Sequence, residues 1–214
     1  MLPDMYDLVI RAFVLFTAMP IHEFAHGWVA NKLGDPTARY QGRLTLNPFA
    51  HLELTGVLMM LLVGFGWAKP VPVNPYNFKR NRKGSMALTA LAGPMSNLLM
   101  ALAAMLVCKI SAVALGSFTV MSVAFLVCQI NITLMVFNLI PVYPLDGSRI
   151  LSFFLPETAT NWVEEHSQII YMVFLAVVLF TPLLDIPLTI ASRWFLGLLN
   201  RLTSIGSLLP MIAF

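Results

Sequence analysis

Long apolar runs constrain the fold of this chain more than any other feature. They cover residues 8–30, 86–113, 118–140 and 167–184, and a more polar run follows at 187–212. Each is close to the roughly 20 residues that an α-helix needs to cross a bilayer. Because lipid offers no partner to backbone N–H and C=O groups, such runs must be helical. The sequence therefore predicts an all-α polytopic membrane protein with about five to six transmembrane helices.

The composition agrees with a membrane location. Hydrophobic residues make up 58% of the chain and charged residues only 11%, whereas soluble proteins average about 25% charged residues. No polar block is long enough to form a second domain, so we expect one membrane-embedded domain over residues 1–214. The basic residues cluster in short loops rather than in a long stripe, which argues against nucleic-acid binding.

The first apolar run contains a metal-binding motif. His22 and His26 belong to the sequence HEFAH, and their spacing places both imidazoles on one face of a helix. Glu23 lies about 100° around the helix from His22, where it can act as a base towards a water held by the same metal. The alternative is a pair of histidines satisfied by neighbouring groups. Ionisable residues inside a membrane are costly and usually functional, which favours a zinc site.

A catalytic zinc ion needs a third protein ligand. A histidine six residues after the motif would indicate a metzincin, but Lys32 occupies that position. Glu53 and Asp146 are the remaining candidates. We favour Asp146 because the sequence PVYPLDG at 141–147 has two prolines that break helical bonding and a glycine that permits a tight turn. The alternative for Asp146, a helix N-cap for residues 148–155, is compatible with metal binding.

The stretch 52–66 is apolar but short for a membrane span. Basic residues flank it on both sides, at Lys32, Arg39 and Arg43 before it and at Lys69, Lys79, Arg80, Arg82 and Lys83 after it. Because basic loops stay on the cytoplasmic side, we expect the stretch to enter and leave from that side. This topology puts Glu23 and Asp146 near the same face, whereas a full crossing would separate them; a short tilted span is the alternative.

Two connecting segments, 37–46 and 67–76, look extended rather than helical. The first alternates and contains β-branched residues, and the second contains three prolines that restrict it to an edge strand or a polyproline stretch. Such an edge would pair with an extended substrate, as a protease requires. The alternative is ordinary connecting loop.

Three motifs together resemble the site-2 protease family of intramembrane zinc metalloproteases. They are HEFAH at 22–26, AGPMSN at 92–97 and NLIPVYPLDG at 138–147. The resemblance implies one Zn²⁺ per chain held by His22, His26 and Asp146, with Glu23 as the general base that activates the zinc-bound water. It also implies a three-helix catalytic core within residues 8–147, followed by C-terminal helices over 148–214. The insertion at 52–66 departs from the shortest members of the family.

The same resemblance implies the partners and the location. Expected substrates are membrane-anchored proteins or signal-peptide remnants, cleaved in or near a transmembrane segment. The protein would lie among the lipids of a bacterial cell membrane, with its active site towards the cytoplasmic side. The oligomeric state does not follow from the sequence.

Three further polar residues lie in or beside apolar helices. Asn97 and Asn138 are candidates for stabilising the oxyanion or binding the substrate backbone, and their alternative is hydrogen bonding between helices. His51 is a candidate for supporting the metal ligands or for contacting substrate, although a lone interfacial histidine usually does neither.

Two other function classes fit part of the pattern. Broken helices with buried polar groups also occur in transporters and channels, which would carry flux without using Glu23 as a base. A non-catalytic member of the same fold is the other alternative, but the complete set of ligands and base argues against it.

Overall fold

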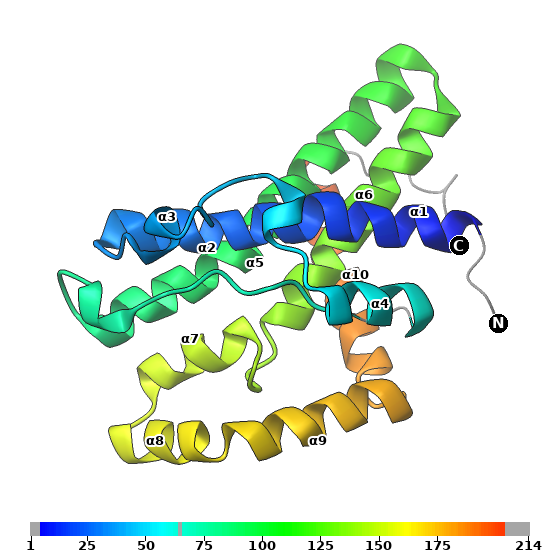
Figure 1. Ribbon diagram of the computed structural model, residues 1–214. Coiled ribbons are helices and arrows are strands. Elements are labelled where there is room, and N and C mark those ends of the chain that lie inside the picture. The colour runs from blue at the N-terminus through cyan, green and yellow to red at the C-terminus, as the bar shows by residue number, and fades with distance from the viewer. Residues whose placement is uncertain (1–4, 64–65, 204–214) are drawn as a thin grey trace.

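The computed structural model describes residues 5–63 and 66–203, and within them it contains helices and loops but no β-strand (Figure 1). The α-helices are α1 (Met5–Phe13), α2 (Met19–Leu33), α3 (Thr37–Tyr40), α4 (Leu54–Val63), α5 (Arg82–Ile110), α6 (Phe118–Asn138), α7 (Asp146–Phe154), α8 (Glu157–Glu165), α9 (Ser167–Phe180) and α10 (Asp185–Leu202). The predicted all-α class is confirmed.

Three helices of the described residues are long and apolar enough to cross a membrane. They cover Leu8–Leu33, Arg82–Leu115 and Phe118–Asn138, and α8 with α9 forms a fourth span if this pair, bent by 67°, counts as one. Only 28% of the most apolar window of each long helix is buried inside the protein, as expected for helices whose apolar surface faces lipid. The chain is an integral membrane protein, while the number of spans and the single-domain division remain predictions.

The first span is a single helix with a local irregularity. A π-helical turn, Val14–Ala18, separates α1 from α2 and stands directly before Pro20. Proline has no N–H to donate to the preceding turn, and a π-turn is one way a helix adjusts to such a break. The helix continues past this point and ends at Gly34, whose φ of 113° is left-handed.

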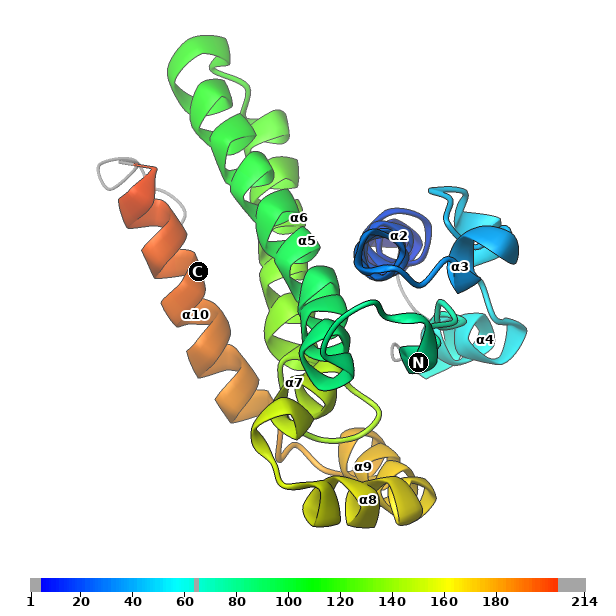
Figure 2. The same cartoon turned by 90° about the vertical axis from the view of Figure 1, so that its left-hand side faces the viewer.

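The second and third spans form an antiparallel hairpin that carries the main core. Ala101, Met105, Cys128, Ile132 and Met135 are buried between α5 and α6. Helix α10 packs on this hairpin with Leu199, on the side away from α2 and α3 (Figure 2). The first span crosses the hairpin and contacts α5, so α5 joins the HEFAH helix to the rest of the protein.

The prediction of an extended segment at 37–46 is wrong for its first part. Residues Thr37–Tyr40 form the short helix α3. The carboxylate of Asp35 accepts hydrogen bonds from the main-chain N–H of Thr37, at 3.1 Å, and from its hydroxyl. A carboxylate placed just before a segment accepts hydrogen bonds from the N–H groups that the first turn of a helix leaves unpaired. At Thr37–Tyr40 this contact outweighs the strand preference of the β-branched residues.

The apolar stretch 52–66 contains the ten-residue helix α4. Arg11 of α1 donates hydrogen bonds to the carbonyl oxygens of Met60 and Leu61 near its end. The chain then returns along residues 66–74, which are neither helix nor strand, before the 3₁₀ turn Pro75–Asn77. The predicted re-entrant path is compatible with this short helix and stays a prediction.

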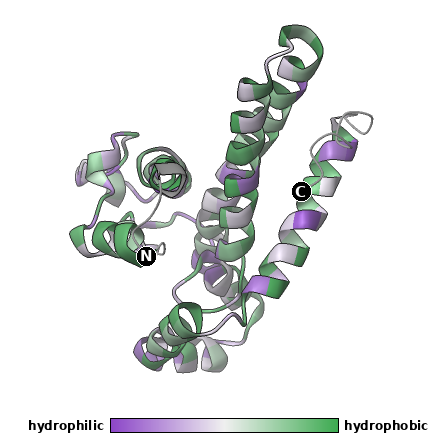
Figure 3. Ribbon diagram, turned by 90° about the vertical axis from the view of Figure 1, so that its right-hand side faces the viewer, coloured by the Kyte–Doolittle hydropathy of each residue, from purple (hydrophilic) through white to green (hydrophobic). Residues whose placement is uncertain are grey.

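The C-terminal helices differ in polarity. Hydrophobic residues cover most of α4, α5, α6 and α9, whereas hydrophilic residues recur along α10 (Figure 3). The loop before α7 contains a cis peptide bond between Tyr143 and Pro144. The end of the run predicted at 187–212 lies outside the described residues.

Candidate metal centre

Three side chains capable of binding one metal ion meet at the centre of the molecule. His22 and His26 come from α2, and Asp146 is the first residue of α7. The Nε2 atoms of the histidines are 3.0 Å apart, and Asp146 Oδ2 lies 3.1 Å from His22 Nε2 and 3.3 Å from His26 Nε2. Bonds of about 2.0–2.2 Å in a tetrahedral arrangement put zinc ligands roughly 3.3–3.5 Å apart. The triangle therefore fits one zinc ion.

The tautomer of His26 is set by the hydrogen bond that its Nδ1 atom makes. Nδ1 of His26 lies 2.7 Å from the main-chain carbonyl oxygen of Thr89 on α5. A carbonyl only accepts hydrogen bonds, so Nδ1 carries the hydrogen and Nε2 keeps its lone pair for the metal. Such a contact also fixes the ring orientation of a ligand. The Nδ1 atom of His22 is buried without a hydrogen-bond partner among the described residues.

Gly93 on α5 makes the room that the two imidazoles need. A Cβ atom added there would lie 2.5 Å from Cε1 of His22 and of His26, and closer still to Nε2 of His26. No side chain fits at that distance, so any larger residue must displace the rings. The AGPMSN motif thus belongs to the metal centre through its glycine.

The position of Asp146 depends on a close approach between two helices. At Gly147, an added Cβ would lie within 2.5 Å of the main chain at Leu139, so glycine lets α7 begin against the end of α6. The side chain of Asp146 does not cap its own helix, which rules out the N-cap role.

Glu23 is held by the segment at 66–74. Its Oε2 atom accepts a hydrogen bond of 2.8 Å from the main-chain N–H of Val71. The same residue lines the central cavity, as the three ligand candidates do. The carboxylate of Glu23 and the ligand triangle therefore share one cavity, and its role as the base stays a prediction.

The central cavity has a volume of about 1030 Å³. Residues from α2, α4, α5, α6, α7 and α9 and from the segment 66–73 line it. This volume is at the upper end of the roughly 300–1,000 Å³ of small-molecule pockets, so a stretch of polypeptide fits. The cavity therefore connects the metal centre with space for a large substrate.

Comparison with known proteins identifies the family. The chain is 40% identical over 182 residues, covering 82% of this chain and 81% of the relative, to a Bacillus subtilis (strain 168) protein named "Putative zinc metalloprotease YwhC". This chain belongs to peptidase family M50. The profile of that family, Peptidase family M50, matches residues 107–181 and so includes Asp146. The family is that of the site-2 proteases, as the resemblance predicted.

More distant relatives agree with this assignment. Proteins named "Putative zinc metalloprotease Rip2" are 29% identical over 206 residues in Mycobacterium tuberculosis (strain ATCC 25618 / H37Rv) and 28% over 198 residues in Mycolicibacterium smegmatis. These alignments cover 88% and 90% of this chain and 74% and 71% of the relatives. No solved structure gives a significant match. As a member of family M50, the chain is a zinc-dependent membrane protease.

The structure places both predicted asparagines on the cavity of this M50 protein. Asn97 is 1% exposed, and its Oδ1 atom has no hydrogen-bond partner among the described residues. Asn138 also lines the cavity, and its Nδ2 donates to the carbonyl oxygen of Leu134 one turn earlier. Within the described part of the chain, neither side chain makes a hydrogen bond to another helix, and the substrate roles stay predictions.

The structure does not bring His51 or Glu53 to the ligand triangle. The ring of His51 is buried and bonds through Nε2 to the carbonyl oxygen of Thr45, 2.8 Å away, which indicates a role in shaping the loop. Glu53 lines the cavity but accepts its hydrogen bond from Thr55. Among the described residues, only His22, His26 and Asp146 group as candidate metal ligands.

Sequence reasoning missed several supporting contacts of the M50 site. The Thr89 carbonyl and the Val71 amide are main-chain groups, so their residue types carry no signal of the role. Gly93 stood inside a recognised motif, but its contact with both imidazoles depends on how α5 packs on α2.

Proposed function

We propose that this M50 protein is an intramembrane endopeptidase that hydrolyses peptide bonds in or near transmembrane segments of membrane-anchored proteins. One observation carries the proposal: the ligand triangle and Glu23 open onto the same cavity, between helices long enough to span a membrane. A site for soluble substrates would not need to lie among apolar helices of this length.

His22, His26 and Asp146 would hold the zinc ion. The triangle of their ligand atoms suits four-coordinate zinc with one position left for substrate or water. When bound, zinc supplies a Lewis acid that polarises the scissile carbonyl and makes a water molecule more acidic.

Glu23 would act as the general base and then as the acid. Its Oε1 atom accepts no hydrogen bond from the described residues, whereas Oε2 is held by Val71. Oε1 therefore takes the proton from the attacking water and passes it to the amine nitrogen as the C–N bond breaks. The carboxylate of Glu23 is thereby regenerated. The hydroxyl group of the water becomes part of the new carboxyl group, and its proton becomes part of the new amine.

Asn97 and Asn138 would contact the substrate backbone. A peptide in the cavity offers N–H groups to the unpaired Oδ1 of Asn97. The Nδ2 group of Asn138 has a second hydrogen besides the one it donates to Leu134, and this hydrogen suits the developing oxyanion.

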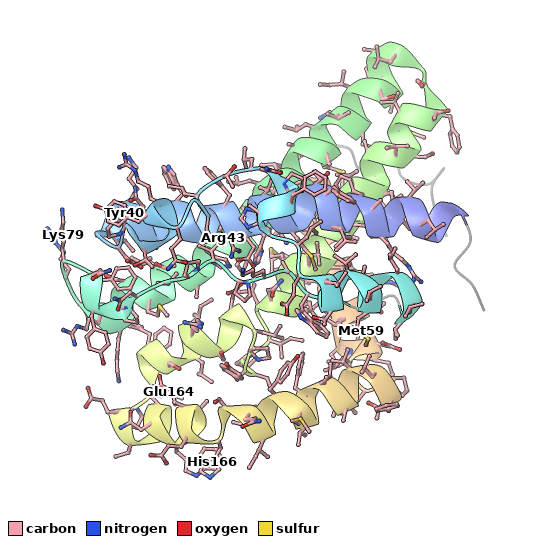
Figure 4. The ribbon with its side chains drawn as sticks, viewed as in Figure 1. Tyr40, Arg43, Met59, Lys79, Glu164 and His166 are labelled. Carbon is pink, nitrogen blue, oxygen red and sulfur yellow. The ribbon has the colours of Figure 1, made fainter. Side chains whose placement is uncertain are left out.

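The substrate would reach the site from the membrane and near its cytoplasmic side. Basic residues gather in the loops at the α2 and α5 ends next to the metal centre, where the positive-inside rule puts the cytoplasm. Figure 4 shows Tyr40 and Lys79 together at this end of the molecule. A transmembrane helix hides its carbonyls, so the cleaved stretch must unwind locally.

The test uses purified protein in sealed vesicles with a membrane-anchored peptide substrate. We expect cleavage by the zinc-loaded wild type and a loss of about 10²–10⁴-fold in Glu23→Gln at equal zinc content. Cleavage that survives in Glu23→Gln would refute the mechanism. Flux across the vesicles with no cleavage by the wild type would instead support a transporter.

A further inference from the structure

Val71 lies in an unusual stretch of main chain. Pro70 and Pro72 stand on either side of it, and proline has no N–H, so the amide of Val71 is the only backbone donor in the three residues. That single donor is directed at Oε2 of Glu23, 2.8 Å away. No neighbouring amide competes for the same carboxylate oxygen.

The side chain of Val71 fixes which way the amide points. It is buried, and its Cγ1 atom would lie 3.1 Å from a Cβ added at Gly27, one turn beyond Glu23 on α2. The residue therefore packs against the same helix that carries the base, so its N–H and Glu23 cannot separate without breaking this contact.

Hydrogen bonds on both sides hold the segment in place. Before Val71, Arg43 donates to the carbonyl oxygens of Lys69 and Pro70, at 2.6 and 3.3 Å; it lies between α2 and the connection that leads to α5 (Figure 4). After Val71, the N–H of Asn74 donates to Asp35 at 2.7 Å. The amide is thus held on both sides by groups outside the metal centre.

We propose that the main-chain amide of Val71 is the positioning group for the catalytic base. By binding Oε2, it selects one rotamer of Glu23 and leaves Oε1 as the oxygen that accepts the proton. A glutamate side chain has three rotatable bonds, and a displacement of about 1 Å at a reacting group costs roughly 10²-fold in rate. This inference rests on the role of Glu23 in the proposed function.

The sharpest test removes the N–H and keeps the side chain. Cell-free translation into lipid nanodiscs introduces α-hydroxyisovaleric acid at position 71, which replaces the amide by an ester. The same ester at Val73, whose amide donates no hydrogen bond within the described residues, measures the general cost of an ester in this segment. Val71→Ala keeps the amide and measures the cost of the side chain.

We expect kcat of the ester at Val71 to fall about 10–100-fold relative to the ester at Val73, with KM and zinc per chain within twofold. In a Glu23→Gln background, the ester at Val71 should cause no further loss, because glutamine cannot act as a base and the amide has no base left to position. Equal kcat for the two esters, a higher kcat for the ester at Val71, or loss of zinc would overturn the inference.

Arg43→Gln provides a second variant, at a partly buried position outside the metal centre. It removes the contact with Lys69 and Pro70 but leaves the Val71 amide intact, so we expect kcat to fall about threefold to tenfold with zinc content unchanged. Unchanged kcat would count against the inference. If the wild type cleaves nothing, or Glu23→Gln stays active, the proposed function fails; a neutral ester in an active enzyme refutes only the role of Val71.

Discussion

The two walls of the central cavity are built in different ways. The helical wall, formed by α2, α5 and α7, carries the ligand triangle and obtains its geometry from regular spacing and close helix packing. The second wall includes the segment 66–74, which has neither helix nor strand and is held by individual hydrogen bonds to Asp35, Arg43 and His51. In the proposed function, the first would position the metal ligands and the second would position the base.

Because the two walls differ, the positions of the metal ligands and the orientation of Glu23 depend on different contacts. Metal ligands that share a helix keep their relative positions as long as the helix is intact. The orientation of Glu23 depends on a contact between residues 23 and 71, so it can be lost without disturbing the ligands. Variants in the two walls should therefore have different effects on zinc content, activity and stability.

Gly93→Ala should have the largest effect, because it places a methyl group against both imidazoles of the helical wall. We expect zinc affinity and cleavage to fall about 100-fold or more. The matched control is Gly84→Ala on the same helix, where an added Cβ meets only the side chain of Phe153 at 3.5 Å and that of Asn81. Zinc titration and cleavage assays check both variants; equal behaviour would contradict the account of the helical wall.

Asp35→Asn should release one end of the segment 66–74. Asp35 is fully buried and accepts hydrogen bonds from Thr37, Asn74 and Asn77, and bonds to a charged acceptor contribute about 1.5–3 kcal/mol each. We expect the free energy of unfolding in detergent to fall by about 2–3 kcal/mol. Asp185→Asn, at an exposed position of α10, is the control.

The same residue predicts a dependence on pH. Burial acts to raise the pKa of Asp35, but its hydrogen bonds lower it below the ordinary value. A lowered pKa in the folded state contributes stability above the unfolded value of about 3.9, and this contribution is lost as the pH falls through the folded value. The stability difference between wild type and Asp35→Asn should stay constant above about pH 5 and shrink below about pH 4. A difference that grows on acidification would contradict the assignment.

Arg11→Gln should have the smallest effect. Its guanidinium binds the carbonyl oxygens of Met60 and Leu61 near the end of α4, where a positive charge also favours the helix dipole. We expect a loss of about 1–2 kcal/mol in unfolding free energy, with zinc content unchanged. Arg39→Gln, exposed on α3, serves as the control. A loss of zinc in Arg11→Gln would show that the two walls are coupled.

The helical wall is also the part that the sequence predicts well. The HEFAH spacing places His22 and His26 on one face because helical periodicity is local. Asp146 follows from the break in helical bonding at PVYPLDG together with the charge pattern of the loops. These signals depend on a few neighbouring residues, and the structure brings the three side chains together.

The second wall, which includes the segment 66–74, could not be predicted in the same way. The start of the segment 37–46 is helical because Asp35 binds the N–H of Thr37, a contact that outweighs strand propensity over four residues. The Val71 amide contacts Glu23 only because the chain returns after α4, and main-chain groups carry no residue signal. His51 was a candidate for the site, yet its ring bonds within its own loop.

The central claim is that two histidines of one helix and an aspartate distant in sequence form one zinc site, and zinc per chain measures it most directly. Purified wild type should hold one zinc ion by mass spectrometry, while His22→Ala, His26→Ala and Asp146→Ala should each lose it. Glu53→Ala is the matched control, because this carboxylate lines the same cavity outside the triangle. Full zinc in Asp146→Ala, or its loss in Glu53→Ala alone, would contradict the account.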